Sequence, residues 1–256
     1  MVRAMTTDQD PSPGTTHFGF RTVREDEKAS LVREVFDDVA PRYDLMNDLM
    51  SAGVHRLWKE AFVTWLRPRP HMTLLDVGGG TGDIAFRFRQ KGGGPVVVCD
   101  INREMLAVGR DRAIDRGILN DIDWVCGDAE HVPMADNSVD AYTIAFCLRN
   151  VTHIDQALRE ARRVLRPGGR FMCLEFSHVV IPALRVLYDQ YSFKLLPRLG
   201  ELVAGNREAY QYLVESIRRF PQQEELAARI EAAGLEQVKI RNLSGGIAAI
   251  HSAWRL

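Results

Sequence analysis

The segment Leu74–Asp83 constrains the fold of this chain more than any other stretch of it. It reads Leu-Leu-Asp-Val-Gly-Gly-Gly-Thr-Gly-Asp, so a short apolar run leads directly into four glycines within five positions. Glycine adopts positive φ without strain and lets a ligand approach the main chain closely. The segment therefore predicts a buried strand, a tight turn and a helix N-terminus with free N–H groups. Such a turn also serves plain packing of a helix on a strand, so it does not by itself establish a binding site.

Around this segment, short apolar runs alternate with longer stretches of helical pattern. The predicted strands are Leu74–Val77, Val96–Cys99, Asp123–Cys126, Ala141–Phe146 and Phe171–Phe176. The predicted helices are Ile84–Lys91, Arg103–Arg116, Ile154–Leu165 (followed by a turn at 166–170) and Gln223–Ala233. Val238–Leu243 and Ile247–Trp254 predict a closing antiparallel pair. This alternation predicts an α/β fold, a doubly wound Rossmann-like sheet with helices on both faces.

The other segments predict one domain with two additions. Residues 1–16 are rich in Thr, Asp, Pro and Gly and lack an apolar stretch, so we expect a disordered tail. Residues 17–256 then form one domain, in which 17–65 make an N-terminal helical cap because apolar residues recur at helical spacing from Leu31 to Val39. Residues 179–208 interrupt the alternation with large apolar and aromatic side chains, which predicts a lid-like insertion.

Charge and composition narrow the classes of partner. The formal net charge is −1 and the pI is near 6.7, which disfavours nucleic acid as the main partner. No run of 18 apolar residues occurs, so we expect no transmembrane helix. The four cysteines form no Cys-x-x-Cys pair, and we expect four reduced core thiols in a cytoplasmic protein and no metal site. They are Cys99, Cys126, Cys147 and Cys173.

The spacing of the glycines indicates the kind of nucleotide. Gly78, Gly80 and Gly82 give G-x-G-x-G, whereas a dinucleotide-binding turn has G-x-G-x-x-G, and this disfavours a nicotinamide oxidoreductase. Asp76, two residues before the first of these glycines, suits a cationic ligand better than a pyrophosphate. Its carboxylate can pair, through water or neighbouring amides, with the amino group and sulfonium of S-adenosylmethionine.

Two further acidic residues follow successive predicted strands. Asp100 ends the second strand, where a carboxylate can accept both ribose hydroxyls, although it could instead cap the helix that starts near Arg103. Asp128 follows the third strand and is placed to accept the adenine amino group, while the N–H of Ala129 can donate to a ring nitrogen. The alternative for Asp128 is an ordinary Asx turn. Three such elements at successive strand ends predict a nucleotide site.

These elements together resemble the class I S-adenosylmethionine-dependent methyltransferases. The resemblance implies a mostly parallel seven-stranded sheet with one antiparallel strand and S-adenosylmethionine as the methyl donor. It also implies a set of cofactor-binding residues, namely Asp76, Gly78, Gly80, Thr81, Asp100, Ile101, Asp128 and Ala129.

Further segments resemble the ubiquinone and menaquinone biosynthesis C-methyltransferases. They are Tyr43–Asn47 with Ser51, His55 and Trp58, then Ala145–Val151, Arg163–Ser177 and Asn242–Ala248. The likeness extends from His17 onward, with Arg166 where lysine is usual and Cys147 where glycine is more usual. It implies methylation of a ring carbon of a prenylated quinol, either a benzoquinol, a naphthoquinol or both.

The resemblance also suggests residues that act on the acceptor. We expect Arg149 and Asn150 to hold or polarise the ring oxygens, because an arginine can stabilise a phenolate. Alternatively, Arg149 only forms a salt bridge with a neighbouring carboxylate; Glu175 could orient Arg149 or cap the next helix. Tyr43, His55 and Trp58 are candidates for binding the substrate, and the alternative for them is a structural aromatic cluster.

Other functions stay open at this stage. A methyltransferase of the same fold could act on another small or lipid acceptor, and a non-catalytic scaffold of a quinone-synthesis complex would predict a broken cofactor site. A prenylated substrate suggests contact with the inner face of the membrane without a spanning helix. The sequence does not decide between a monomer, a homodimer and a larger complex.

Overall fold

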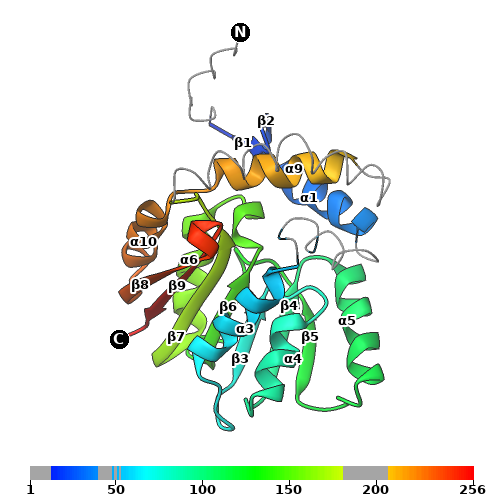
Figure 1. The fold of residues 1–256 in the computed structure, drawn as a ribbon, viewed down its shortest axis with the longest axis vertical. Coiled ribbons are helices and arrows are strands. Elements are labelled where there is room, and N and C mark those ends of the chain that lie inside the picture. The colour runs from blue at the N-terminus through cyan, green and yellow to red at the C-terminus, as the bar shows by residue number, and fades with distance from the viewer. Residues whose placement is uncertain (1–12, 40–47, 49–50, 52, 181–206) are drawn as a thin grey trace.

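A seven-stranded sheet forms the centre of the molecule (Figure 1). The computed structural model describes residues 13–39, 48, 51, 53–180 and 207–256. The strand order is β5-β4-β3-β6-β7-β9-β8. All neighbours are parallel except that β9 runs antiparallel to both β7 and β8, which confirms the predicted doubly wound fold. The strands are β3 (Leu74–Val77), β4 (Val96–Asp100), β5 (Ile122–Cys126), β6 (Val139–Ala145), β7 (Leu165–Phe176), β8 (Glu236–Leu243) and β9 (Ala248–Trp254).

Helices cover both faces of the sheet because the strands are apolar on both sides. On β7, for example, Met172 belongs to one core cluster and Phe171 and Cys173 belong to the other. The first cluster packs α3 (His55–Leu66), α4 (Asp83–Gln90) and α9 (Arg207–Arg219) with part of α5 (Arg103–Asp115). The second packs α6 (Ile154–Val164) and α10 (Gln223–Ala232).

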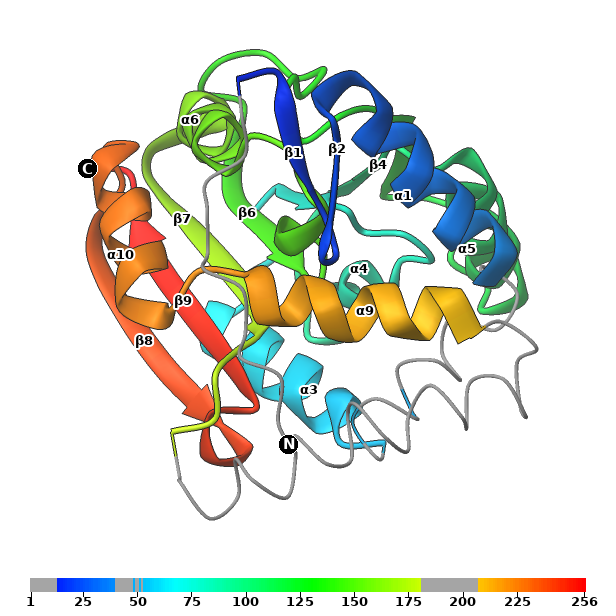
Figure 2. The ribbon, with the colours of Figure 1, turned by 90° about the horizontal axis from the view of Figure 1, so that it is seen from above.

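A cap lies over the carboxyl ends of the parallel strands. It contains α1 (Glu25–Val39), α9 and a two-stranded hairpin of β1 (Thr15–Phe18) and β2 (Arg21–Arg24), as seen from above in Figure 2. Thr15 and Thr16, predicted to belong to a disordered tail, pair with Arg24 and Val23. The predicted helical cap at 17–65 thus also contains strands, because the hairpin packs through Phe18 on the cap helices.

Two other expectations need correction. Residues 166–169 form an irregular part of β7 rather than a turn that precedes it, since Leu165 pairs with Val139 and Arg170 pairs with Ala141. Of the four predicted core thiols, Cys99 and Cys173 are fully buried, Cys147 is half-buried and Cys126 is exposed. Cys126 lies at the end of the edge strand β5, which has a neighbour on one side only. Among the helices of the described residues, none has both the length and the apolarity to cross a bilayer.

Candidate functional site

A cavity open to solvent lies at the carboxyl ends of β3, β4, β5 and β6. Its walls come from α1 and from the loops that follow these strands. All eight residues predicted to bind the cofactor line it, and so does Asn150. This is the position at which open α/β sheets bind ligands. Arg149, His55 and Trp58 are not among its lining residues, and Tyr43 lies outside the described residues.

The glycine turn has the conformation that its sequence predicts. Gly78, Gly80 and Gly82 have φ values of 61°, 51° and 82°. The N–H of Gly78 donates to the Cys99 carbonyl at 2.7 Å, so the turn is tied to the adjacent strand β4. A Cβ at Gly78 would lie 2.2 Å from the Cys147 Sγ, which leaves no room for a side chain. The turn therefore exposes main chain to the cavity in a fixed position.

Asp76 lies directly under this turn. It is fully buried, and its Oδ1 accepts a hydrogen bond from the Thr143 hydroxyl at 2.7 Å. Its Oδ2 has no hydrogen-bond partner among the residues that the structure describes. Burial, with the nearby carboxylates of Asp100 and Asp83, raises the pKa of Asp76 to about 7. A buried carboxylate oxygen without a hydrogen-bond partner favours a cationic ligand beside it.

Asp100, the last residue of β4, holds the glycine turn from the neighbouring strand. Its Oδ2 accepts from the N–H of Gly80 at 2.9 Å, and its Oδ1 accepts from the N–H of Asn102 at 2.8 Å. The helix cap considered for Asp100 is supplied instead by Asn102, which accepts from the N–H of Met105. Burial raises the pKa of Asp100 to about 6, although its backbone hydrogen bonds act in the opposite direction. Each carboxylate oxygen keeps a second lone pair for a ribose hydroxyl.

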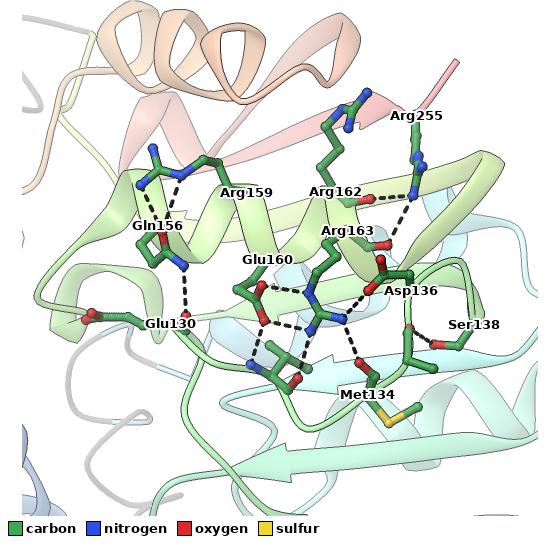
Figure 3. Close-up of polar contacts among 12 residues, drawn as sticks. Glu130, Met134, Asp136, Ser138, Gln156, Arg159, Glu160, Arg162, Arg163 and Arg255 are labelled. Carbon is green, nitrogen blue, oxygen red and sulfur yellow. Dashed lines mark hydrogen bonds and ion pairs between the residues drawn. The ribbon is translucent and has the colours of Figure 1, made fainter.

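Asp128 combines the two interpretations given above. Its Oδ1 accepts from the N–H of Glu130 at 2.9 Å, as in an Asx turn, and the residue also lines the cavity. The loop that follows is anchored to α6 by Arg163, which bonds Glu160, Asp136 and the carbonyls of Val132 and Met134 (Figure 3). This network holds the expected adenine loop in place.

Lys59 is a cavity residue that sequence reasoning missed. Its side chain is buried, and its Nζ donates to Asp83 Oδ2 at 2.8 Å. Asp83 also accepts from Arg87, which in turn pairs with Glu60. The available signal was a lysine on the apolar face of α3, one residue after Trp58. The positive charge of Lys59 suits the carboxylate of an amino-acid ligand.

The turn after β6 contains the predicted catalytic pair on the 3-10 helix η2 (Leu148–Asn150). The Arg149 guanidinium donates to Glu175 Oε1 at 2.8 Å and to the Phe146 carbonyl at 2.5 Å. Both charged side chains are 2% exposed. Burial raises the pKa of Glu175, and Arg149 counteracts part of that rise. The salt bridge considered for Arg149 is thus present, and Glu175 orients it.

His55 and Trp58 fasten α3 to the rest of the domain. His55 Nε2 lies 2.9 Å from Asp48 Oδ1. Trp58 donates from Nε1 to the Ser244 hydroxyl at 2.9 Å, and its ring contacts Phe176 edge-on with centroids 5.9 Å apart. These contacts agree with the structural aromatic cluster, and neither side chain lines the cavity as the structure describes it.

Comparison with known proteins extends these observations. A sequence model of the ubiE/COQ5 methyltransferase family matches residues 21–255. The ubiquinone/menaquinone biosynthesis C-methyltransferase UbiE of Brucella abortus is 57% identical over 250 residues, which cover 96% of this chain and 93% of that protein. UbiE of Brucella anthropi is 56% identical over 243 residues, 93% of this chain and 92% of that protein. A SAM-dependent methyltransferase from Thermotoga maritima superposes with a TM-score of 0.63 at 19% identity, over 87% of this chain and 99% of that one.

Proposed function

Because this chain belongs to the ubiE/COQ5 methyltransferase family, we propose that it transfers a methyl group from S-adenosylmethionine to a ring carbon of a prenylated quinol. One candidate acceptor is demethylmenaquinol, which is converted to menaquinol. The other is the 2-polyprenyl-6-methoxy-1,4-benzoquinol of the ubiquinone pathway, and the protein acts on one of them or on both. The observation that carries this proposal is the 57% identity to UbiE over 96% of the chain.

The cavity fits the cofactor. Its described lining has the carboxyl groups of Asp76, Asp83, Asp100, Asp128 and Glu130 and the cations Lys59 and Arg33, which suits a ligand with cationic groups and one carboxylate. S-Adenosylmethionine supplies a methyl group that its sulfonium has already activated. We assign the ribose to Asp100 and Ile101, the adenine to Asp128 and Ala129, and the amino-acid part to the Gly78–Thr81 turn with Asp76 and Lys59.

The protein's own contribution to the reaction is alignment and a hydrogen bond to the acceptor. Asn150 lines the cavity, and we assign it a hydrogen bond to a ring oxygen of the acceptor. Arg149, whose positive charge is paired with Glu175, holds the turn that carries Asn150. A hydrogen bond from Asn150 favours ionisation of that ring hydroxyl, which raises the nucleophilicity of the adjacent carbon. His55 and Trp58 would support the wall of the acceptor site from α3, and the assignment of Tyr43 to the acceptor stays a prediction.

The setting of the reaction follows from the acceptor. A quinol with a prenyl tail resides in a membrane, so we propose that the protein works from the cytoplasm against the inner face. The lid-like insertion predicted at 179–208 falls largely outside the described residues and stays a prediction, as does assembly into a homodimer or a quinone-synthesis complex.

The test is methyl transfer from radiolabelled S-adenosylmethionine to short-tailed demethylmenaquinol and to the methoxy-benzoquinol, each offered separately. Labelled product from either acceptor supports the proposal and shows which ring the site accepts. If neither acceptor is labelled while calorimetry shows that the cofactor binds, another acceptor or a scaffold role would replace the proposal.

A further inference from the structure

Tyr212 brings the cap helix α9 into contact with the turn that carries Asn150. Its hydroxyl lies 3.0 Å from Asn150 Oδ1, and its side chain is buried. Its ring stacks on Phe18 of the hairpin, with centroids 4.3 Å apart and planes inclined by 21°. Figure 2 shows α9 crossing above the carboxyl ends of the strands, between the hairpin and α3. Tyr212 therefore connects α9, the β1–β2 hairpin and the turn after β6. They meet at the part of the cavity that Asn150 lines, which we call the acceptor side.

The hydrogen bond fixes which end of the amide faces the cavity. A side-chain amide has an accepting oxygen at one end and a donating NH₂ at the other. Burial raises the pKa of Tyr212, so its hydroxyl keeps its proton and acts as a donor. If the amide were turned round, its NH₂ would face this hydroxyl, whose proton would lose the acceptor that it has here. A buried donor without an acceptor is costly, so the observed orientation is favoured.

We propose that Tyr212 is a positioning residue for methyl transfer. By donating to Oδ1 of Asn150, it directs the NH₂ of that amide toward the ring oxygen of the acceptor. This inference rests on the proposed function, which gives Asn150 its contact with the acceptor. The packing of Tyr212 on Phe18 makes the alignment depend on the hairpin and α9 being in place over the site.

The substitution Tyr212→Phe tests the proposal, because it keeps the ring and its stacking but removes the hydroxyl. The expected result is a fall in kcat of roughly tenfold with the acceptor, while the Kd for S-adenosylhomocysteine in calorimetry stays within about twofold. Tyr142→Phe is the matched control. Tyr142 lies in the sheet core and not in the cavity lining, so kcat should not change. An unchanged kcat in Tyr212→Phe would overturn the inference.

A double-mutant cycle separates positioning from a general structural effect. In an Asn150→Ala background, Tyr212→Phe should lower kcat by less than about twofold, because the group that it orients is gone. Losses that multiply would show that Tyr212 acts independently of Asn150 and would also overturn the inference.

A spectroscopic readout keeps the inference testable if the wild-type protein methylates neither quinol. In protein labelled with a heavy nitrogen isotope, Tyr212→Phe should shift the side-chain amide signals of Asn150, assigned through Asn150→Ala. Tyr142→Phe should leave them in place. Unchanged amide signals in Tyr212→Phe would refute the positioning role, whereas absence of methyl transfer in the wild type would refute the proposed function alone.

Discussion

The proposed cofactor side of the cavity (the strand-end loops with Gly78–Thr81, Asp100 and Asp128) and its proposed acceptor side (Asn150 with Tyr212 beside it) are built differently. The cofactor side consists of short loops at the ends of adjacent strands. Backbone N–H groups of these loops hold two of its carboxylates, since Asp100 accepts from Gly80 and Asn102 and Asp128 accepts from Glu130. The acceptor side depends on side chains from distant segments. Tyr212 and Asn150, for example, are 62 residues apart. The first side should bind its ligand with little help from the second, whereas the second needs the complete fold.

The largest effect is expected when the acceptor side loses its buried ion pair. Glu175→Ala removes the carboxylate that faces Arg149, and a buried charge that loses its partner costs about 3–5 kcal/mol in the free energy of unfolding. Chemical denaturation measures this change. Glu225→Ala breaks an exposed pair with Arg229 on α10 and should cost less than about 0.5 kcal/mol. Similar losses in the two variants would show that the 149–175 pair does not stabilise the acceptor side.

The cofactor side should respond to pH. Burial raises the pKa of Asp76 to about 7 and that of Asp100 to about 6, whereas an aspartate in the unfolded chain titrates near about 3.9. Between these values the folded protein binds more protons than the unfolded chain, so the stability of the ligand-free protein falls as pH rises from about 4 to 7. A cationic ligand prefers the ionised carboxylates. Its affinity should therefore rise roughly tenfold between about pH 5.5 and 7.5, with release of protons.

Calorimetry with S-adenosylmethionine in buffers of different ionisation enthalpy measures both the affinity and the released protons. Asp100→Asn should flatten part of the profile, and Asp123→Asn, an exposed position on β5, should leave it as in the wild type. A flat profile in the wild type would mean that both carboxylates are already ionised without ligand.

Lys59 is an exception to the local construction of the cofactor side, because it lies on α3 and bonds Asp83 next to the glycine turn. Replacing it tests whether the cofactor side depends on a distant helix. Lys59→Met should weaken S-adenosylhomocysteine roughly tenfold, since a charge-assisted hydrogen bond to the carboxylate is lost. Decarboxylated S-adenosylmethionine should bind the variant and the wild type alike. Arg87→Met is the control, because Arg87 also pairs with Asp83 but does not line the cavity. Equal weakening of both ligands would contradict the assignment of the carboxylate to Lys59.

The difference between strand-end loops and contacts from distant segments also explains which parts of the site could be predicted from the sequence. The glycine turn, Asp100 and Asp128 are local patterns, and each directly follows an apolar run, so their place at the strand ends follows from chain order. Lys59 has only a weak local signal, its place on the apolar face of α3, and Tyr212 has none, because the roles of both depend on which helix packs over the site. The hairpin was missed for a related reason. Its short strands are largely polar, and they are held by contacts with α1 and α9 rather than by their own alternation.

The smallest effect concerns the sheet beneath both sides. The hydroxyl of Tyr142 on β6 is buried without a hydrogen-bond partner among the residues described, while its ring stacks on Phe171 with centroids 5.7 Å apart. Tyr142→Phe keeps the stacking and removes the unsatisfied group, so the free energy of unfolding should rise by about 1 kcal/mol. Denaturant unfolding measures the change, and the affinity for S-adenosylhomocysteine should stay constant. A loss of stability would show that the hydroxyl has a partner, and a loss of affinity would show that the cofactor side depends on the sheet core below it.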